Sequence, residues 1–210
     1  MRIKICGITR YEDARTAANL GADALGFIFY SKSPRYISPT NAAEITKKLP
    51  PFVSRVGVFV DEDPQRVLDV ARIAGIDTIQ LHGNETPEYC ASIPLPVIKV
   101  FSIRDNFDVS IILAYKNVDV AGILLDTWDS ERRGGSGNTF DWSVALKVCD
   151  KSDKVILSGG LGPSNIREAI DTVRPYAVDV NSGVEISPGV KSPYKMRDVI
   201  TIVKKMGQVD

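Results

Sequence analysis

Short apolar runs alternate along the chain with longer segments that open at a proline or a small polar residue and often close at a glycine. A short apolar run is typical of a parallel strand buried on both faces, and the longer segments are typical of helices. The pattern predicts strands within residues 3–6, 22–29, 53–60, 77–81, 96–100, 120–125, 155–157 and 177–180. It predicts helices over residues 9–21, 39–49 and 63–75, after Pro87, over residues 108–115, from Asp141, from residues 163–165 and over residues 192–206. Thr9, followed by Glu12, is the expected N-cap of the first helix.

A short sequence pattern recurs at the start of several of these units. A helix end, an aspartate in the turn and an apolar strand recur at Gly21-Ala22-Asp23, Gly75-Ile76-Asp77 and Asn117-Val118-Asp119. Eight consecutive strand–helix units without a linker predict an α/β fold, a (β/α)8 TIM barrel that forms a single domain over residues 1–210. An open doubly wound sheet is the alternative, but no G-x-G-x-x-G follows the first strand.

Composition narrows the class of protein. The chain has 210 residues, of which 44% are hydrophobic, enough for one substantial core. Its 26 basic and 26 acidic residues balance and form no basic block, which argues against a nucleic-acid partner and gives no reason to expect membrane binding. The first residues lack the apolar core of a signal peptide, and the three scattered cysteines form neither a disulfide framework nor a zinc spacing. We therefore expect a cytoplasmic protein.

The last two predicted strands each end in a glycine-bearing turn. They lead into Ser158-Gly159-Gly160 and Asn181-Ser182-Gly183. Glycines let backbone N–H groups approach an anion, and in a barrel the loops after the last two strands commonly hold phosphate. Such glycines can also serve only to make tight turns. Because the two turns occur in tandem, we expect a phosphate-binding site at Gly159, Gly160, Ser182 and Gly183.

Barrel active sites lie at the carboxyl ends of the strands, so reactive side chains at those ends are candidates for catalysis. Cys6 ends the first strand, and a thiol with a modestly shifted pKa can act as a base. Asp126 follows an apolar run, where partial loss of solvent would raise its pKa and suit a general acid. The alternatives are a buried Cys6 that only packs and an Asp126 that only caps a helix or anchors a loop.

Three further side chains lie at or near predicted strand ends. Arg35 suits bidentate binding of a carboxylate, His82 could orient a substrate, and Asp179 could bind a sugar hydroxyl. The alternatives are that Arg35 is a solvated loop arginine, that His82 only satisfies a turn, and that Asp179 only anchors its strand. Because His82 is the only histidine and the carboxylates lack metal-ligand spacing, we expect no metal site. The glycine-rich loop over residues 128–138 lacks the lysine and spacing of a P-loop and is expected to form a lid.

Seven motifs, in order along nearly the whole chain, resemble one enzyme family. They are Lys4-Ile5-Cys6-Gly7-Ile8-Thr9, Ser33-Pro34-Arg35-Tyr36-Ile37, Gln80-Leu81-His82-Gly83, Leu125-Asp126-Thr127, Gly134-Gly135-Ser136-Gly137 with Phe140-Asp141-Trp142, Ser158-Gly159-Gly160-Leu161 and Asp179-Val180-Asn181-Ser182-Gly183-Val184-Glu185. Each motif alone is weakly specific, whereas all of them in order are highly specific. On these residues the chain resembles the phosphoribosylanthranilate isomerases of tryptophan biosynthesis.

The resemblance implies a cofactor-free Amadori rearrangement on a (β/α)8 barrel, which converts N-(5-phosphoribosyl)anthranilate into 1-(o-carboxyphenylamino)-1-deoxyribulose 5-phosphate. By resemblance, Asp126 is the general acid that opens the furanose ring, and Cys6 is the general base that removes the proton from ribose C2. Arg35 would bind the anthranilate carboxylate, and the backbone near Gly160 and Ser182-Gly183 would hold the phosphate. The partner would be this small phosphosugar, and family members occur as monomers and homodimers.

Other functions stay open at this point. His82 and Asp179 match motif positions, but the resemblance gives them no settled role. A ribulose-phosphate epimerase would need metal-binding histidines, which the chain lacks. The two-phosphate isomerase of histidine biosynthesis would need a second glycine-rich phosphate-binding site. The glycines near strands three and four are poor candidates for it. A non-catalytic phosphosugar-binding barrel is the alternative from another class, although Cys6 and Asp126 are both present.

Overall fold

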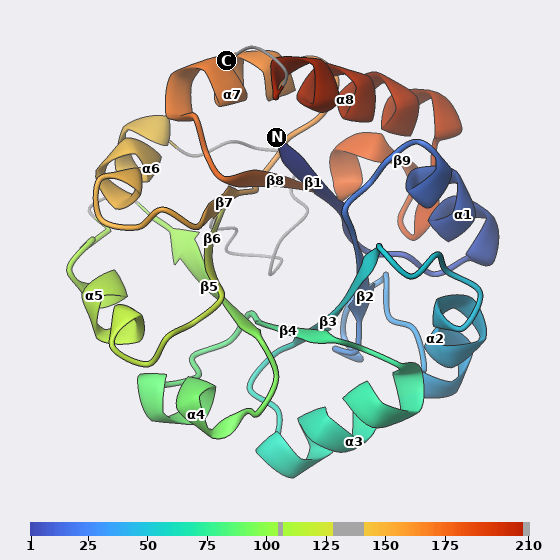
Figure 1. The fold of residues 1–210 in the computed structure, drawn as a ribbon, viewed down its shortest axis with the longest axis horizontal. Helices are drawn as coiled ribbons and strands as arrows, with labels where there is room; N and C mark the ends of the chain where they lie inside the picture. The colour runs from blue at the N-terminus through green and yellow to red at the C-terminus, as the bar shows by residue number, and fades with distance from the viewer. Residues whose placement is uncertain (105–106, 128–140, 208–210) are drawn as a thin grey trace.

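The computed structural model describes residues 1–104, 107–127 and 141–207. Eight parallel strands close into a barrel in the order β1 to β8, and β1 pairs with β8 to complete the ring. Figure 1 shows the helices arranged as an outer ring around this barrel. The predicted (β/α)8 fold is therefore confirmed, and closure of the sheet excludes the open doubly wound alternative.

The elements lie within a few residues of their predicted positions. The barrel strands are β1 (Arg2–Ile5), β2 (Ala24–Ile28), β3 (Ser54–Phe59), β4 (Thr78–Leu81), β5 (Val97–Ile103), β6 (Gly122–Thr127), β7 (Val155–Leu157) and β8 (Ala177–Val180). The helices are α1 (Tyr11–Asn19), α2 (Pro39–Thr46), α3 (Pro64–Ala74), α4 (Pro87–Ser92), α5 (Ile111–Lys116), α6 (Trp142–Cys149), α7 (Ile166–Val173) and α8 (Pro193–Met206). A 3-10 turn, η1 (Ser182–Val184), and an antiparallel hairpin of β9 (Glu185–Ser187) and β10 (Val190–Lys191) separate β8 from α8. The sequence pattern did not predict this hairpin.

Two predicted helix starts are wrong, each because a side chain has a different partner. The Thr9 hydroxyl does not cap α1 but donates a hydrogen bond to the carbonyl of Gly189, in the turn between β9 and β10. The fifth helix begins at Ile111 rather than at residue 108. The Asp108 carboxylate accepts a hydrogen bond from the backbone N–H of Ser110 at 2.9 Å, which makes a local turn ahead of the helix.

Strand alternation sorts the side chains into two compartments. Outward-facing residues pack against the helices and form the main hydrophobic core. A smaller cluster fills the barrel interior, and it consists of Val56, Ile98, Val100, Leu124, Ile156 and Ala177. Two residues further along their strands, Asp126 follows Leu124 and Asp179 follows Ala177, and both carboxylates are buried. The interior therefore changes from apolar to polar toward the carboxyl ends of the strands.

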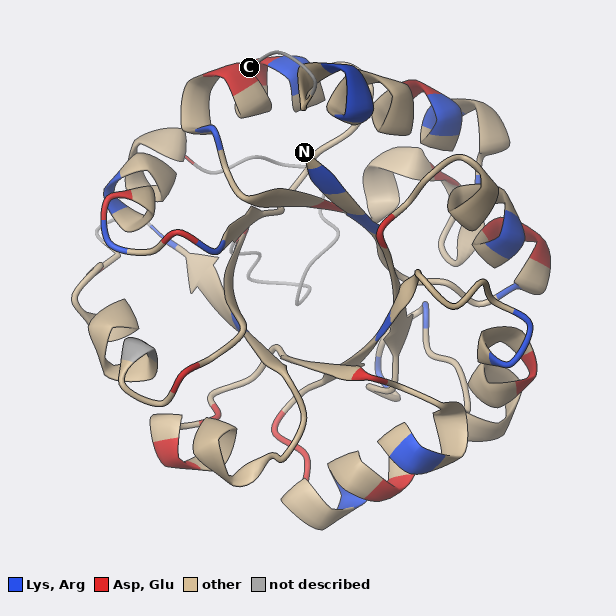
Figure 2. Ribbon diagram, viewed as in Figure 1, with Lys and Arg blue, Asp and Glu red and all other residues tan. Residues whose placement is uncertain are grey.

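Charged residues are spread around the outer helices in the view of Figure 2, with acidic and basic side chains interspersed. The acidic and basic residues, which are equal in number in the sequence, are therefore also mixed in space in this view. Among the residues described, no helix combines the length and the apolar character needed to cross a membrane.

Candidate active site

A cavity of about 490 Å³ opens at the carboxyl ends of the barrel strands, where this fold places its active sites. Its walls include all but one of the residues predicted from the sequence, namely Cys6, Arg35, His82, Asp126, Asp179, Gly159, Gly160 and Ser182. The structure thus brings side chains from β1, β2, β4, β6, β7 and β8, or from the loops that follow them, around one space.

The exception is Gly183, which does not line the cavity. A Cβ atom at Gly183 would collide with the carbonyl group of Leu161, so this glycine allows the loop after β8 to pack closely on the loop after β7. Gly159 has a left-handed backbone with φ of +87°, and a Cβ atom there would collide with Thr127. Both glycines therefore shape the two loops of the predicted phosphate site.

The Asp126 carboxyl group lies inside the barrel on β6 and is 6% exposed. One oxygen accepts a hydrogen bond from the backbone N–H of Thr127 at 2.9 Å, and the other lies 3.4 Å from Nε2 of His82. Burial, together with the negative charge of Asp179, raises the pKa of Asp126 to about 7. The group can therefore carry a proton near neutral pH, as a general acid must.

Cys6 lies directly after β1, and its backbone N–H donates to the carbonyl of Val180 in β8 at 2.9 Å. Its thiol is buried beside the ammonium group of Lys4. Burial raises the pKa of the Cys6 thiol, and the positive charge of Lys4 opposes this rise without cancelling it. A thiolate at rest would need a lowered pKa, so the pKa of Cys6 is shifted in the opposite direction.

Lys4 and Asp179 form a buried ion pair that the sequence analysis missed. The two residues are partners in register across the junction of β1 and β8, and Nζ of Lys4 donates to Oδ2 of Asp179 at 2.8 Å. Burial lowers the pKa of Lys4, but the charge of Asp179 and the neighbouring Cys6 outweigh it, so the pKa lies above its ordinary value. Oδ1 of Asp179 is buried and has no hydrogen-bond partner within the described part of the chain. This oxygen is available to a ligand hydroxyl.

Arg35 lines the cavity and is buried, so the alternative of a solvated loop arginine is wrong. Nε and Nη2 of Arg35 donate to both carboxylate oxygens of Glu185 at 2.8–3.1 Å. Burial raises the pKa of Glu185, but the hydrogen bonds from Arg35 and Lys191 outweigh it and hold the pKa below its ordinary value. Glu185 belongs to a motif of the sequence analysis, yet only the structure reveals that it is the partner of Arg35.

Gln80 is a further polar residue of the cavity wall, and its Oε1 atom is buried without a hydrogen-bond partner among the residues described. Its place two residues before His82, on the same face of the strand, is the signal that could have identified it. Within the described ranges, no group of three or more histidine, cysteine, aspartate or glutamate side chains is arranged to hold a metal ion. The predicted lid, residues 128–138, lies outside the described residues.

Comparison with known proteins places the chain in a family. The model of the N-(5'-phosphoribosyl)anthranilate isomerase family matches residues 3–202. The chain belongs to this family. It is 52% identical over 206 residues to the N-(5'-phosphoribosyl)anthranilate isomerase of Thermotoga neapolitana, a match that covers 97% of this chain and 98% of that one.

Solved phosphoribosylanthranilate isomerases have the same fold. The crystal structure of the isomerase from Thermotoga maritima matches with a TM-score of 0.91 at 49% identity, over 98% of this chain and 99% of that one. A second isomerase structure, a complex with reduced 1-(o-carboxyphenylamino)-1-deoxyribulose 5-phosphate, matches with a TM-score of 0.87 at 46% identity, over 98% and 99% of the two chains. The family predicted from the sequence motifs is thus confirmed, whereas the roles of individual residues stay predictions.

Proposed function

We propose that the protein catalyses the Amadori rearrangement of N-(5-phosphoribosyl)anthranilate to 1-(o-carboxyphenylamino)-1-deoxyribulose 5-phosphate, with Asp126 as general acid and Cys6 as general base. The observation that supports these roles most strongly is the buried carboxyl group of Asp126, whose pKa of about 7 lets it donate a proton in the cavity that Cys6 also lines. Proton transfer at two atoms of a sugar needs one acid and one base of suitable pKa.

In the first step, Asp126 donates its proton to the furanose ring oxygen. The bond between C1 and that oxygen breaks, and the lone pair of the anthranilate nitrogen forms a C1=N double bond, which gives a protonated Schiff base. The carboxylate that Asp126 becomes is stabilised by hydrogen bonds from the backbone N–H of Thr127 and the side chain of Ser158. Opening the ring thus leaves the acid charged but hydrogen-bonded.

In the second step, Cys6 first loses its thiol proton to solvent, and the resulting thiolate removes the proton from C2. The electron pair of that C–H bond moves toward the Schiff base nitrogen, which yields an enolamine, and the enolamine tautomerises to the ketone. Because burial disfavours the thiolate, the ammonium group of Lys4 has a direct effect on this step, since it lowers the pKa that burial raises. Lys4 therefore supports the base, whereas the negative charge of Asp179 raises the pKa of Cys6 and acts in the opposite direction.

The remaining cavity residues bind the substrate. We infer that Gly160 and Ser182 contact the phosphate, that Arg35 binds the anthranilate carboxylate, and that Asp179 and His82 contact the sugar. Binding energy from the phosphate, remote from the reacting carbon, positions C2 against the base. We further propose that the protein works in the cytoplasm on this small substrate, without a nucleic-acid partner, as a monomer or a homodimer.

Turnover of freshly generated phosphoribosylanthranilate, followed by the loss of its fluorescence, tests this function. We expect the wild type to be active, and Cys6→Ala and Asp126→Ala to lower kcat/KM about 10²–10⁴-fold, because each removes one proton-transfer group. Both variants should still bind a product analogue. The matched control is Cys90→Ala, which removes a cysteine that is equally buried but lies in α4, outside the cavity wall, and should leave the rate unchanged.

Two other outcomes would change the conclusion. Binding of the product analogue by a wild type that does not turn over the substrate would favour the non-catalytic phosphosugar-binding barrel. Normal rates in Cys6→Ala and Asp126→Ala would leave the reaction in place and show that the acid and the base are other residues.

A further inference from the structure

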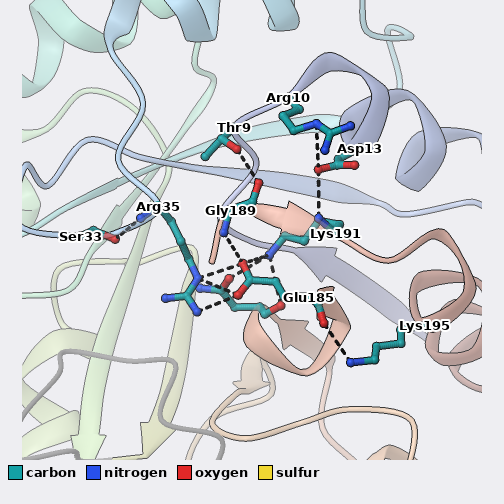
Figure 3. A network of polar contacts seen from close by, with 10 residues as sticks. Thr9, Arg10, Asp13, Ser33, Arg35, Glu185, Gly189, Lys191 and Lys195 are labelled. Carbon is teal, nitrogen blue, oxygen red and sulfur yellow. Dashed lines mark hydrogen bonds and ion pairs between the residues drawn. The ribbon is translucent and has the colours of Figure 1, made fainter. Parts of the chain in front are cut away.

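Glu185 lies behind the cavity wall at the centre of a buried polar network, and none of the proposed chemical steps uses it. Its carboxylate accepts hydrogen bonds from Nε and Nη2 of Arg35 at 2.8–3.1 Å, from Nζ of Lys191 at 2.9 Å and from the backbone N–H of Gly189 at 3.1 Å. Glu185 and Arg35 are each 7% exposed, and Lys191 is 1% exposed. Figure 3 shows these side chains converging beside the β9–β10 hairpin.

The guanidinium group of Arg35 is held along one edge only. Nε and Nη2 face Glu185, while Nη1 makes no hydrogen bond with any residue that the structure describes. Figure 3 shows this nitrogen directed away from Glu185. Because Arg35 lines the cavity, the edge formed by Nη1 and Nη2 can receive a second carboxylate.

A second branch of the network reaches another part of the cavity. Nζ of Lys191 donates to the carbonyl oxygen and to Oδ1 of Asn181 at 3.1 and 2.9 Å. Asn181 lines the cavity next to Ser182, at the predicted phosphate end. A single carboxylate, that of Glu185, therefore connects the residue proposed to bind the substrate carboxylate with the loop proposed to bind the phosphate.

The hairpin that carries Glu185 has other anchors. Thr9 donates to the carbonyl of Gly189, and the backbone N–H of Lys191 donates to Oδ2 of Asp13 in α1 at 3.0 Å. On the other side, Nζ of Lys195 donates to the carbonyl oxygen of Glu185 itself at 2.9 Å. None of these bonds involves the Glu185 side chain, so the hairpin keeps its attachments when that carboxylate is changed.

We propose that Glu185 is a positioning residue, which presents the free edge of Arg35 to the aryl carboxylate of the substrate and so sets the preference for a phosphosugar amine that carries this carboxylate. The proposal rests on the proposed function, in which Arg35 binds that carboxylate. A flexible arginine loses rotamer freedom when it orders around a ligand. Glu185 removes that freedom before the ligand binds. Lys191 donates to the same carboxylate and to Asn181, in the loop proposed to bind the phosphate.

The test compares two ligands that differ only in the carboxylate. They are the reduced product analogue, 1-(o-carboxyphenylamino)-1-deoxyribulose 5-phosphate in reduced form, and its phenylamino counterpart without the carboxylate. In Glu185→Gln, which keeps the shape but removes the charge, we expect affinity for the carboxylated ligand to fall about 10–100-fold. Affinity for the carboxylate-free ligand should change little. In turnover, KM should rise by more than kcat falls.

Controls separate positioning from folding. Glu85→Gln makes the same change at a buried carboxylate that also pairs with a lysine but does not line the cavity, and it should lower Tm without altering the ratio of the two affinities. In an Arg35→Met background, Glu185→Gln should not change that ratio further, because both act through one interaction. If Glu185→Gln folds poorly, Glu185→Asp, which draws the carboxylate back by one methylene, gives the same readout.

Two results would overturn the proposal. One is a folded Glu185→Gln that keeps the wild-type preference for the carboxylated ligand, whether or not both ligands bind more weakly, and the other is a wild type that has no such preference. Failure of the proposed function looks different, because it appears as a wild type that binds the analogue but does not turn over the substrate, while the affinity ratio still decides the role of Glu185.

Discussion

Two buried lysine–carboxylate pairs lie on opposite faces of the barrel wall, and they differ in what they leave unsatisfied. The outer pair, Lys99 and Glu85, lies between the barrel and the helices. Nζ of Lys99 donates to Glu85 at 2.7 Å and to the carbonyls of Leu81 and Gly83 at 3.3 and 2.8 Å. The Glu85 carboxylate also accepts hydrogen bonds from the backbone N–H groups of Asp61 and Gly83. The outer pair therefore has a full set of partners within the protein.

The inner pair, Lys4 and Asp179, lies inside the barrel and is incomplete. One oxygen of Asp179 receives the hydrogen bond from Lys4, while the other has no partner among the described residues. Lys4 also lies beside Cys6, whose pKa it lowers against the effect of burial. A buried polar atom without a partner is rare in proteins, and one in a cavity wall is a candidate contact for a ligand. The comparison thus separates a pair whose hydrogen bonds are all made within the protein from a pair that leaves one oxygen without a described partner in the proposed active site.

Breaking the outer pair should have the largest effect on stability. Glu85→Ala leaves the Lys99 ammonium buried without its counter-charge, so we expect the free energy of unfolding to fall by about 3–5 kcal/mol. Denaturant titration measures this loss, and kcat/KM per folded molecule should stay at the wild-type value. A large loss of kcat/KM in fully folded Glu85→Ala would show that the two pairs are not separate in function.

Ionisation of Asp126 inside the barrel should lower the free energy of unfolding, by an amount that depends on pH. Folding raises the pKa of Asp126 from 3.8 to about 7, so between these values the native state binds more protons than the unfolded state, and stability falls as the pH rises through this window. Asp126→Asn removes the effect. We expect it to be more stable than the wild type at pH 8, by up to about 4 kcal/mol, and to differ little near pH 4.

Urea titrations at the two pH values measure this difference. The exposed substitution Asp171→Asn, in α7, is the control and should show no comparable pH dependence. A stability difference for Asp126→Asn that is the same at both pH values would contradict the assignment of a raised pKa to this carboxyl group.

A smaller effect should appear in the pH profile of the reaction. Lys4→Met removes the positive charge that lowers the pKa of Cys6. Because the pKa of Cys6 lies above that of Asp126, the basic limb of the kcat/KM profile reports Cys6, and this limb should move to higher pH by about one unit, with a tenfold loss near neutrality that disappears above the limb. Lys99→Met removes a lysine that is just as buried, and it should lower stability without moving the limb. A uniform loss at every pH in Lys4→Met would indicate a structural role instead.

Much of the fold was predictable because its signals are local. Buried parallel strands appear as apolar runs, and β7 and β8 occupy the predicted residues. The alternation of residues along a strand could have added Lys4 to the candidate list, since it shares the inner face of β1 with Cys6. The two loops proposed to bind phosphate were predicted as a pair, although Gly183 turned out to serve the contact between them.

The features that sequence reasoning missed depend on contacts between distant residues. Arg35 meets Glu185 across 150 residues, and Lys4 meets Asp179 across 175. The local capping signal at Thr9 was overridden by a hydrogen bond to Gly189, in a hairpin that had itself not been predicted. The direction of the Cys6 pKa shift likewise depends on burial, which only the closed barrel produces.

The junction of β1 and β8 also has a consequence for the order in which activity is acquired. Lys4 belongs to the first strand of the barrel and Asp179 to the last, and they are neighbours in register. On the ribosome, Cys6 therefore emerges long before the carboxylate that holds its neighbouring ammonium group. Long-range strand pairing is a slow part of folding. With the roles proposed for Cys6 and Asp179, turnover is acquired only after β8 has been made and the ring has closed, so the reaction itself reports closure of the barrel.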